Sequence, residues 1–289
     1  MERIIALLSR LPLKVLYGIA DTILYPAIYY LLRYRRKVVA KNIAICFPDL
    51  DAPARKALSK RFYHWFCDLA VETIYGYRIS DAEIRERVVF HGLEEREEQI
   101  RQHGGAILYL GHLGCWEWIA DVAKRFEDKT IQSHFIYLAL RNRNADEAML
   151  HLREKRGGSL IEMHKIAREM VARHSLEQPQ VYCMLGDQKP APNSLTFYTP
   201  FFGVEVPFAT GTEKLSAKWN YPVYYARITM PQRGHYDITF ETLSAEPAQE
   251  PKGYLTAEYA RRLETNIKQQ PEIWLWTHNR FKYVRELSK

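Results

Sequence analysis

Short apolar runs alternate with amphipathic stretches through most of this chain, and this alternation constrains the fold most. The runs have the length and composition of buried strands and occupy 106–111, 134–140, 180–186, 222–228 and 236–241. Helical patterns lie between and around them at 92–102, 116–127, 144–156, 164–174 and 256–269. Such alternation is typical of a sheet with helices on both faces. We therefore expect an α/β fold with a mixed, mostly parallel sheet.

The composition excludes several other classes of protein. With 14 Gly and 14 Pro among 289 residues, the chain is neither collagen-like nor of low complexity. The four cysteines have no C-x-x-C spacing, so they indicate no zinc knot or redox pair, and this fits a reducing compartment.

Positive charge is concentrated near the start of the chain. Residues 1–41 contain eight basic and two acidic side chains, which is +6 of the total +7. A nucleic-acid binder would spread its basic groups along a reading surface and interleave them with aromatic side chains. Here the basic groups instead flank an apolar segment, so nucleic acid is not an expected partner.

That apolar segment, 15–32, carries one charged residue, Asp21, and one proline, Pro26. Its 18 residues are marginal for crossing a bilayer, which takes about 20, so it could span the membrane or lie in the interface. The basic flank that follows, RYRRK, would be attracted to an anionic leaflet by about 1 kcal/mol per group. The positive-inside bias then places the protein body in the cytosol. We expect a membrane anchor over 1–41 and one catalytic domain over 42–289, with a buried helical hairpin as the alternative for the anchor.

A long helix is expected over 51–77. Asp51 suits the N-cap and Pro53 the first turn, and apolar residues follow at helical spacing. This helix should pack the anchor onto the catalytic domain.

The strongest candidate for chemistry is His112, which follows the apolar run 106–111 in the sequence GHLGCWE, with Glu117 five positions later. Polar residues just beyond the carboxyl end of a strand often bind ligands in open α/β sheets. Composition alone gives about one His-x4-acid match by chance. A second match, His164 with Glu169, lies within a plain helical pattern. Only His112 lies in a glycine-flanked turn after a buried strand, which is where a ligand site is expected.

An imidazole can take a proton from an alcohol, and a nearby carboxylate can fix its tautomer. The chain contains no G-x-S-x-G nucleophile motif. A metal site at His112, Cys115 and Glu117 would lack a convincing fourth ligand. A turn histidine bonded to the main chain remains an alternative at this point.

Five blocks, in order over 34–282, resemble the late acyltransferases of lipid A biosynthesis, a branch of the lysophospholipid acyltransferase superfamily. They are YRRKVVAKNIAICFPDL, VETIYG, GHLGCWE, GDQKPAPNS with PFFG, and PEIWLWTHNRFK. The resemblance implies a glycerolipid acyltransferase-like fold, His112 as general base and Glu117 as its orienting acid. It also implies acyl-acyl carrier protein as donor, a hydroxyl of a lipid A precursor as acceptor, no cofactor, and the cytoplasmic side of a bacterial inner membrane.

The other blocks supply candidate substrate-binding residues. The family commonly reads YRPL where this chain has Tyr137, Leu138, Ala139 and Leu140, so an arginine from the following loop could replace the missing one. The candidates are Arg141, Arg143, Asp187, Gln188, Lys189, Phe201, Phe202 and Arg280. Two other functions stay open: acyl transfer to a lysophospholipid or amino-lipid, and lipid binding without catalysis.

Overall fold

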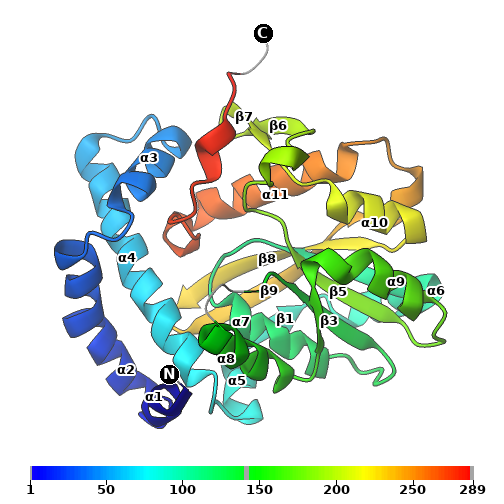
Figure 1. Ribbon diagram of the computed structural model, residues 1–289, viewed down its shortest axis with the longest axis horizontal. Helices are drawn as coiled ribbons and strands as arrows, with labels where there is room; N and C mark the ends of the chain where they lie inside the picture. The colour runs from blue at the N-terminus through cyan, green and yellow to red at the C-terminus, as the bar shows by residue number, and fades with distance from the viewer. Residues whose placement is uncertain (1, 140–142, 287–289) are drawn as a thin grey trace.

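The computed structural model describes residues 2–139 and 143–286, and in this part of the chain a seven-stranded sheet forms the centre of the molecule (Figure 1). Its strand order is β1-β9-β8-β2-β5-β3-β4. The strands are β1 (Val88–His91), β2 (Gly105–Leu110), β3 (Gln132–Tyr137), β4 (Ser159–Glu162), β5 (Gln180–Leu185), β8 (Val223–Gln232) and β9 (His235–Ser244). A separate antiparallel pair consists of β6 (Tyr198–Phe201) and β7 (Val204–Pro207).

The sheet is mixed and mostly parallel, as predicted. Neighbouring strands run parallel except β8 and β9. Only Arg233 and Gly234 separate these two strands, and so short a connection permits only an antiparallel hairpin, because a parallel pair needs a crossover of about a dozen residues. The pattern analysis missed β1, β4, β6 and β7, which have four residues each and are too short to show a period.

Helices cover the sheet, and Figure 1 shows α10 and α11 above the strands with α7 and α8 below. Most of them confirm the predicted positions, but the stretch 116–127 forms only the short helix α7 followed by a 3-10 turn, Ala120–Lys124. The helices of this region are α5 (Asp81–Arg87), α6 (Glu94–His103), α7 (Trp116–Ile119), α8 (Arg143–Glu154), α9 (Ile166–His174), α10 (Gly211–Trp219) and α11 (Tyr254–Gln269).

The N-terminal region packs along one side of the long helix α4, as Figure 1 shows in blue and cyan. It contains α1 (Glu2–Leu8), α2 (Leu13–Ile19), two π-helical turns (Ala20–Leu24 and Pro26–Leu31), α3 (Arg36–Cys46) and α4 (Ala52–Tyr75). The predicted N-cap of α4 is confirmed, because the Asp51 carboxylate accepts a hydrogen bond from the Ala54 N–H at 2.7 Å.

The apolar N-terminal segment is divided between buried and exposed side chains. Leu16, Tyr25 and Tyr29 are buried, whereas Ile23 is 60% and Leu31 79% exposed. Among the described residues, no single helix combines the length and apolar character needed to cross a membrane. Two consecutive helical segments, Leu13–Leu31 and Arg36–Cys46, meet this condition only when taken together, and the chain bends by 86° between them.

A buried carboxylate joins this region to the sheet. Glu72 of α4 accepts hydrogen bonds from the hydroxyls of Tyr17 in α2, at 2.7 Å, and Tyr236 in β9, at 2.6 Å. The indole of Trp118 donates to the Glu72 main-chain carbonyl at 3.1 Å. These bonds hold α2 and α4 against β9.

Candidate active site

The candidate site lies where two neighbouring strands end. β2 and β5 pair in parallel with Leu110 opposite Leu185, so the residues that follow each strand meet at the same edge of the sheet. His112 follows β2 and Asp187 follows β5. This is the edge at which open α/β sheets bind ligands.

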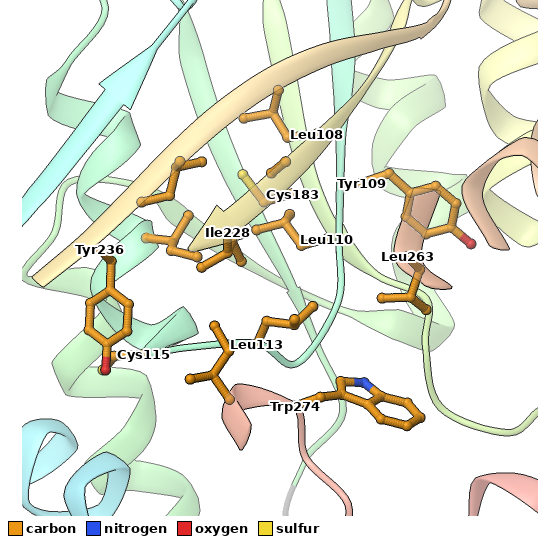
Figure 2. Close-up of a cluster of buried hydrophobic side chains, with 14 of the residues drawn as sticks. Leu108, Tyr109, Leu110, Leu113, Cys115, Cys183, Ile228, Tyr236, Leu263 and Trp274 are labelled. Carbon is orange, nitrogen blue, oxygen red and sulfur yellow. The ribbon is translucent and has the colours of Figure 1, made fainter. Parts of the chain in front are cut away.

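The turn that follows β2 is fixed by buried side chains, and Figure 2 shows Leu113 of this turn among them. Leu113 is fully buried and forms an isolated antiparallel bridge with Trp274. Gly114 has a φ of +55°, and a Cβ there would lie 2.8 Å from the ring of Tyr236, so a larger residue would both strain the backbone and clash. The main chain of His112 is therefore held in place before any substrate arrives.

The carboxylate in contact with His112 is Asp187. The Nδ1 atom of His112 lies 2.5 Å from Asp187 Oδ1, and the His112 main-chain N–H donates to Oδ2 at 3.0 Å. The indole N–H of Trp274 also donates to Oδ2, at 2.8 Å. Burial would raise the pKa of Asp187, but the adjacent His112 and these hydrogen bonds outweigh it and lower the pKa to about 2. A carboxylate therefore faces Nδ1, which must carry the proton, and this leaves Nε2 with a free electron pair.

The other ring nitrogen of His112, Nε2, faces the exposed side chain of Gln188. The amide nitrogen of Gln188 donates toward Nε2 at 3.3 Å, and the His112 side chain is 15% exposed. The Trp116 ring packs edge-on against the imidazole, with centroids 5.0 Å apart. A small polar group could displace the Gln188 amide and bond to Nε2.

The carboxylate that contacts His112 in the structure, Asp187, is not the one that the sequence suggested. Glu117 makes no hydrogen bond to the imidazole among the described residues; Arg153 of α8 holds its carboxylate instead, through contacts of 2.6 and 2.7 Å. The Trp116 indole also donates to Glu117, at 3.0 Å. The physical reason is the topology: β5 lies beside β2 and brings Asp187 to the ring, whereas Glu117 lies inside the first turn of α7.

Glu117 and Arg153 are still connected to His112, through Trp116. Both oxygens of the Glu117 carboxylate, which is 6% exposed, are engaged by the Arg153 guanidinium in a two-pronged ion pair. Burial alone would lower the pKa of Arg153, but the adjacent Glu117 outweighs it and raises this pKa, so Arg153 stays charged. Trp116 connects this pair to the His112 ring. Sequence reasoning missed Arg153, because nothing in the pattern of α8 separates it from a surface arginine.

The segment 274–280 connects the site to α3. Trp274 bonds to Asp187, the Leu275 N–H donates to the His112 carbonyl at 3.1 Å, and the His278 ring accepts from the Lys189 N–H at 3.0 Å. On its other side, Asn42 of α3 donates to the carbonyls of Trp276 and His278 at 2.9 and 2.7 Å. The segment therefore links α3 to the site and supplies the Trp274 contact to Asp187.

The remaining candidates are dispersed. Gln188 lies at His112, and Lys189 contributes its main-chain N–H to His278. Phe201 and Phe202 are buried within an aromatic cluster, where Phe201 packs against Phe208 and Trp274. Their contact with substrate stays a prediction.

Arg280 is 1% exposed, and its guanidinium carbon lies 4.1 Å from the centre of the Phe208 ring. Burial lowers its pKa to about 10, so it remains charged at neutral pH. Arg141 lies outside the described residues. Arg143 begins α8, and its side chain is likewise outside the description.

This arrangement supplies a base without an obvious enzyme nucleophile. Cys115, the nearest thiol in sequence, is buried, and burial raises its pKa well above the usual value. A histidine held by a buried carboxylate, as His112 is by Asp187, has the geometry that can accept a proton from a hydroxyl group.

The comparison with protein families identifies the class of enzyme to which this chain belongs. The chain belongs to the bacterial lipid A biosynthesis acyltransferases, whose family model matches residues 3–283. It is therefore an acyltransferase. No curated protein matches the chain.

Proposed function

We propose that this acyltransferase moves a fatty acyl chain from acyl-acyl carrier protein to a hydroxyl of a lipid A precursor, with His112 as general base. The observation that carries the proposal is the buried Asp187 carboxylate at Nδ1, which leaves Nε2 available as a proton acceptor at the carboxyl edge of the sheet. Family membership supports the reaction type.

In the proposed reaction, the acceptor hydroxyl displaces the Gln188 amide and hydrogen-bonds to Nε2. As its proton passes to Nε2, the oxygen attacks the thioester carbonyl. When the tetrahedral intermediate collapses, the C–S bond breaks, and the imidazolium returns the proton to the departing thiolate. No cofactor is needed, because the thioester is already activated.

Asp187 has two roles in this proposal. It fixes the tautomer that exposes the Nε2 electron pair, and its negative charge stabilises the imidazolium that forms. Trp274 and the His112 main-chain N–H both donate to Oδ2, which keeps Oδ1 at the imidazole Nδ1, so little reorganisation is required during proton transfer.

The pairing of His112 with Glu117 that the sequence suggested is the competing assignment. In the structure Glu117 neutralises and positions Arg153 beside the site, and we assign it that positioning role. The two assignments predict different effects of removing each carboxylate, as described in the Discussion.

We further propose that the N-terminal region holds the site at the cytoplasmic face of the inner membrane. Exposed Ile23, Leu31 and Leu32 support this proposal, because isolated apolar side chains of this size gain from insertion among lipid chains. The adjacent arginines would add attraction to an anionic leaflet. A lipid acceptor could then reach His112 without leaving the bilayer.

The test is acyl transfer by the purified protein, with acyl-acyl carrier protein as donor and three acceptors assayed in parallel: a lipid A precursor, a lysophospholipid and an amino-lipid. We expect transfer to the lipid A precursor, and His112→Ala should lower kcat by roughly 10²- to 10⁴-fold, the usual range for a lost general base.

The matched control is His164→Ala, because His164 is exposed and belongs to the other His-x4-Glu match. It should retain activity within about twofold, as is usual for surface substitutions. Full activity of His112→Ala would refute the proposed base, and transfer only to another acceptor would refute the proposed substrate.

A further inference from the structure

A cationic cavity of about 780 Å³ lies among α3, α4 and the chain just before α3, away from the His112 turn in sequence. Apolar side chains such as Val38 and Ile43 also line it. Its basic lining residues are Arg33, Arg35, Arg36, Lys37, Arg55 and Lys56.

Acidic side chains do not offset this charge within the cavity. The lining formed by described residues contains no Asp or Glu. Arg35 donates to the main-chain carbonyl of Thr277 at 3.0 Å, and Arg36 lies over the Tyr29 ring at 4.4 Å. Asp51, the neighbouring acid in sequence, uses its carboxylate to cap α4. The cavity therefore has a strongly positive potential that an anion would neutralise.

Two helices begin at this cavity, which adds to its positive character. Arg36 and Lys37 lie in the first turn of α3, Arg55 and Lys56 lie near the start of α4, and neither first turn contains an acidic residue. The N-terminal end of a helix carries partial positive charge, which the Asp51 carboxylate offsets at α4 and no acidic residue offsets at α3, so the basic residues at the start of α3 favour a bound anion.

The backbone before α3 directs these side chains at a conformational cost. Arg33 and Arg35 have φ values of 49° and 51°, in the left-handed region that residues other than glycine rarely adopt. Such conformations are concentrated at binding and active sites, where the surrounding structure maintains them.

Apolar residues next to Arg33 in the sequence favour a lipid over a soluble anion. Leu31 and Leu32, which directly precede Arg33, are 79% and 68% exposed, and Tyr34, which follows it, is 44% exposed. Apolar side chains beside a cluster of cations match a ligand that has a phosphate and an acyl chain. Free phosphate would use the cations and leave the exposed Leu31 and Leu32 side chains in water.

We propose that this cavity binds the phosphate group of an anionic phosphorylated lipid while the exposed leucines contact its acyl chains. The inference concerns binding alone, so it holds or fails independently of the acyl-transfer proposal.

The experiment measures binding of the full chain to vesicles. The vesicles contain phosphatidylcholine alone, phosphatidylcholine with phosphatidic acid, or phosphatidylcholine with oleate at matched surface charge, at about 0.15 M salt to limit diffuse attraction. We expect the tightest binding to the phosphatidic acid vesicles.

Two triple variants remove the same charge from the same two helices. Lys37→Gln, Arg55→Gln and Lys56→Gln alter the cavity, whereas Lys41→Gln, Lys60→Gln and Arg61→Gln lie outside its lining. The cavity variant should bind phosphatidic acid vesicles roughly tenfold more weakly or worse, and the control within about twofold of the wild type. The cavity variant should keep or raise its Tm, since it removes cations from helix starts, so weak binding could not be attributed to misfolding.

Three outcomes would overturn the proposal. Equal weakening by both variants would indicate diffuse attraction to the surface. Equally tight binding to oleate vesicles would show that phosphate is not recognised. A rise in Tm with inorganic phosphate, in the absence of lipid, equal to the rise with phosphatidic acid would assign the cavity to a soluble anion.

Discussion

Two fully buried carboxylates in different regions of the molecule respond to burial in opposite ways. Asp187, at the His112 turn, faces an imidazole that can become positive, and its pKa is lowered to about 2. Glu72, beneath the N-terminal region, faces the neutral hydroxyls of Tyr17 and Tyr236, and burial raises its pKa to about 7. Whether a neighbour can carry positive charge decides the ionisation state of each buried acid.

The two carboxylates therefore contribute to stability in opposite pH ranges. Asp187 has a folded pKa below its ordinary value of 3.8, so it stabilises the fold above that pH and loses this contribution as the pH falls toward about 2. Glu72 has a folded pKa above its ordinary value of 4.5, so it stabilises the fold at low pH and loses this contribution as the pH rises to about 7. At pH 7 Asp187 is therefore charged, whereas Glu72 is about half neutral and makes a structural contact.

Replacing Asp187 by Asn should have the largest effect. The variant keeps the shape but loses the charge that favours Nδ1–H and the imidazolium, so kcat should fall by about 10⁴-fold, the effect of the same change to the orienting acid in serine proteases. Steady-state kinetics and a circular dichroism melt at pH 7 would measure activity and folding. Near-normal kcat in a folded variant would show that Asp187 does not serve the base.

Replacing Glu72 by Gln should alter the pH dependence of stability. The wild type should lose on the order of 3 kcal/mol between pH 4.5 and about 7, at roughly 1.4 kcal/mol for each of the 2.5 pKa units between these values, and Glu72→Gln should lack this loss. Urea unfolding of both proteins at several pH values measures the difference. Parallel curves for the two proteins would show that Glu72 ionises normally.

Replacing Glu117 by Gln should have a smaller effect on catalysis than Asp187→Asn. The Gln oxygen can still accept from Trp116, but Arg153 loses its ion pair, so we expect about a tenfold fall in kcat, comparable to the loss of one charged hydrogen bond. If Glu117→Gln lowers kcat more than Asp187→Asn, Glu117 orients the base during the reaction and our assignment is wrong.

Much of the fold could be predicted from the sequence. The run 106–111 and its following turn located β2 and His112, and the cap at Asp51 located the start of α4. These features depend on neighbouring residues, so a local pattern reveals them. Four-residue strands such as β1 and β4 depend on pairing partners distant in sequence, and no local pattern marks them.

The partner of His112 could not be predicted for the same reason. Spacing suggested Glu117, which is five residues away, but the contact is made by Asp187, which is 75 residues away. Only the order of strands in the sheet places β5 beside β2. The sequence did mark Asp187 as following a buried strand, which was sufficient to include it in the site but not to give its role.

The contacts of segment 274–280 also determine when, during synthesis, the surroundings of His112 and Asp187 can be completed. Trp274 and Leu275 complete the surroundings of Asp187 and His112, and Asn42 near the start of the chain bonds to Trp276 and His278. The hydrogen bonds around His112 and Asp187 therefore cannot all form until residue 278 has been synthesised and has left the ribosome. A nascent chain could fold much of its sheet while still lacking the indole that holds the Asp187 carboxylate, so the His112–Asp187 pair should become fully oriented only after segment 274–280 has been synthesised.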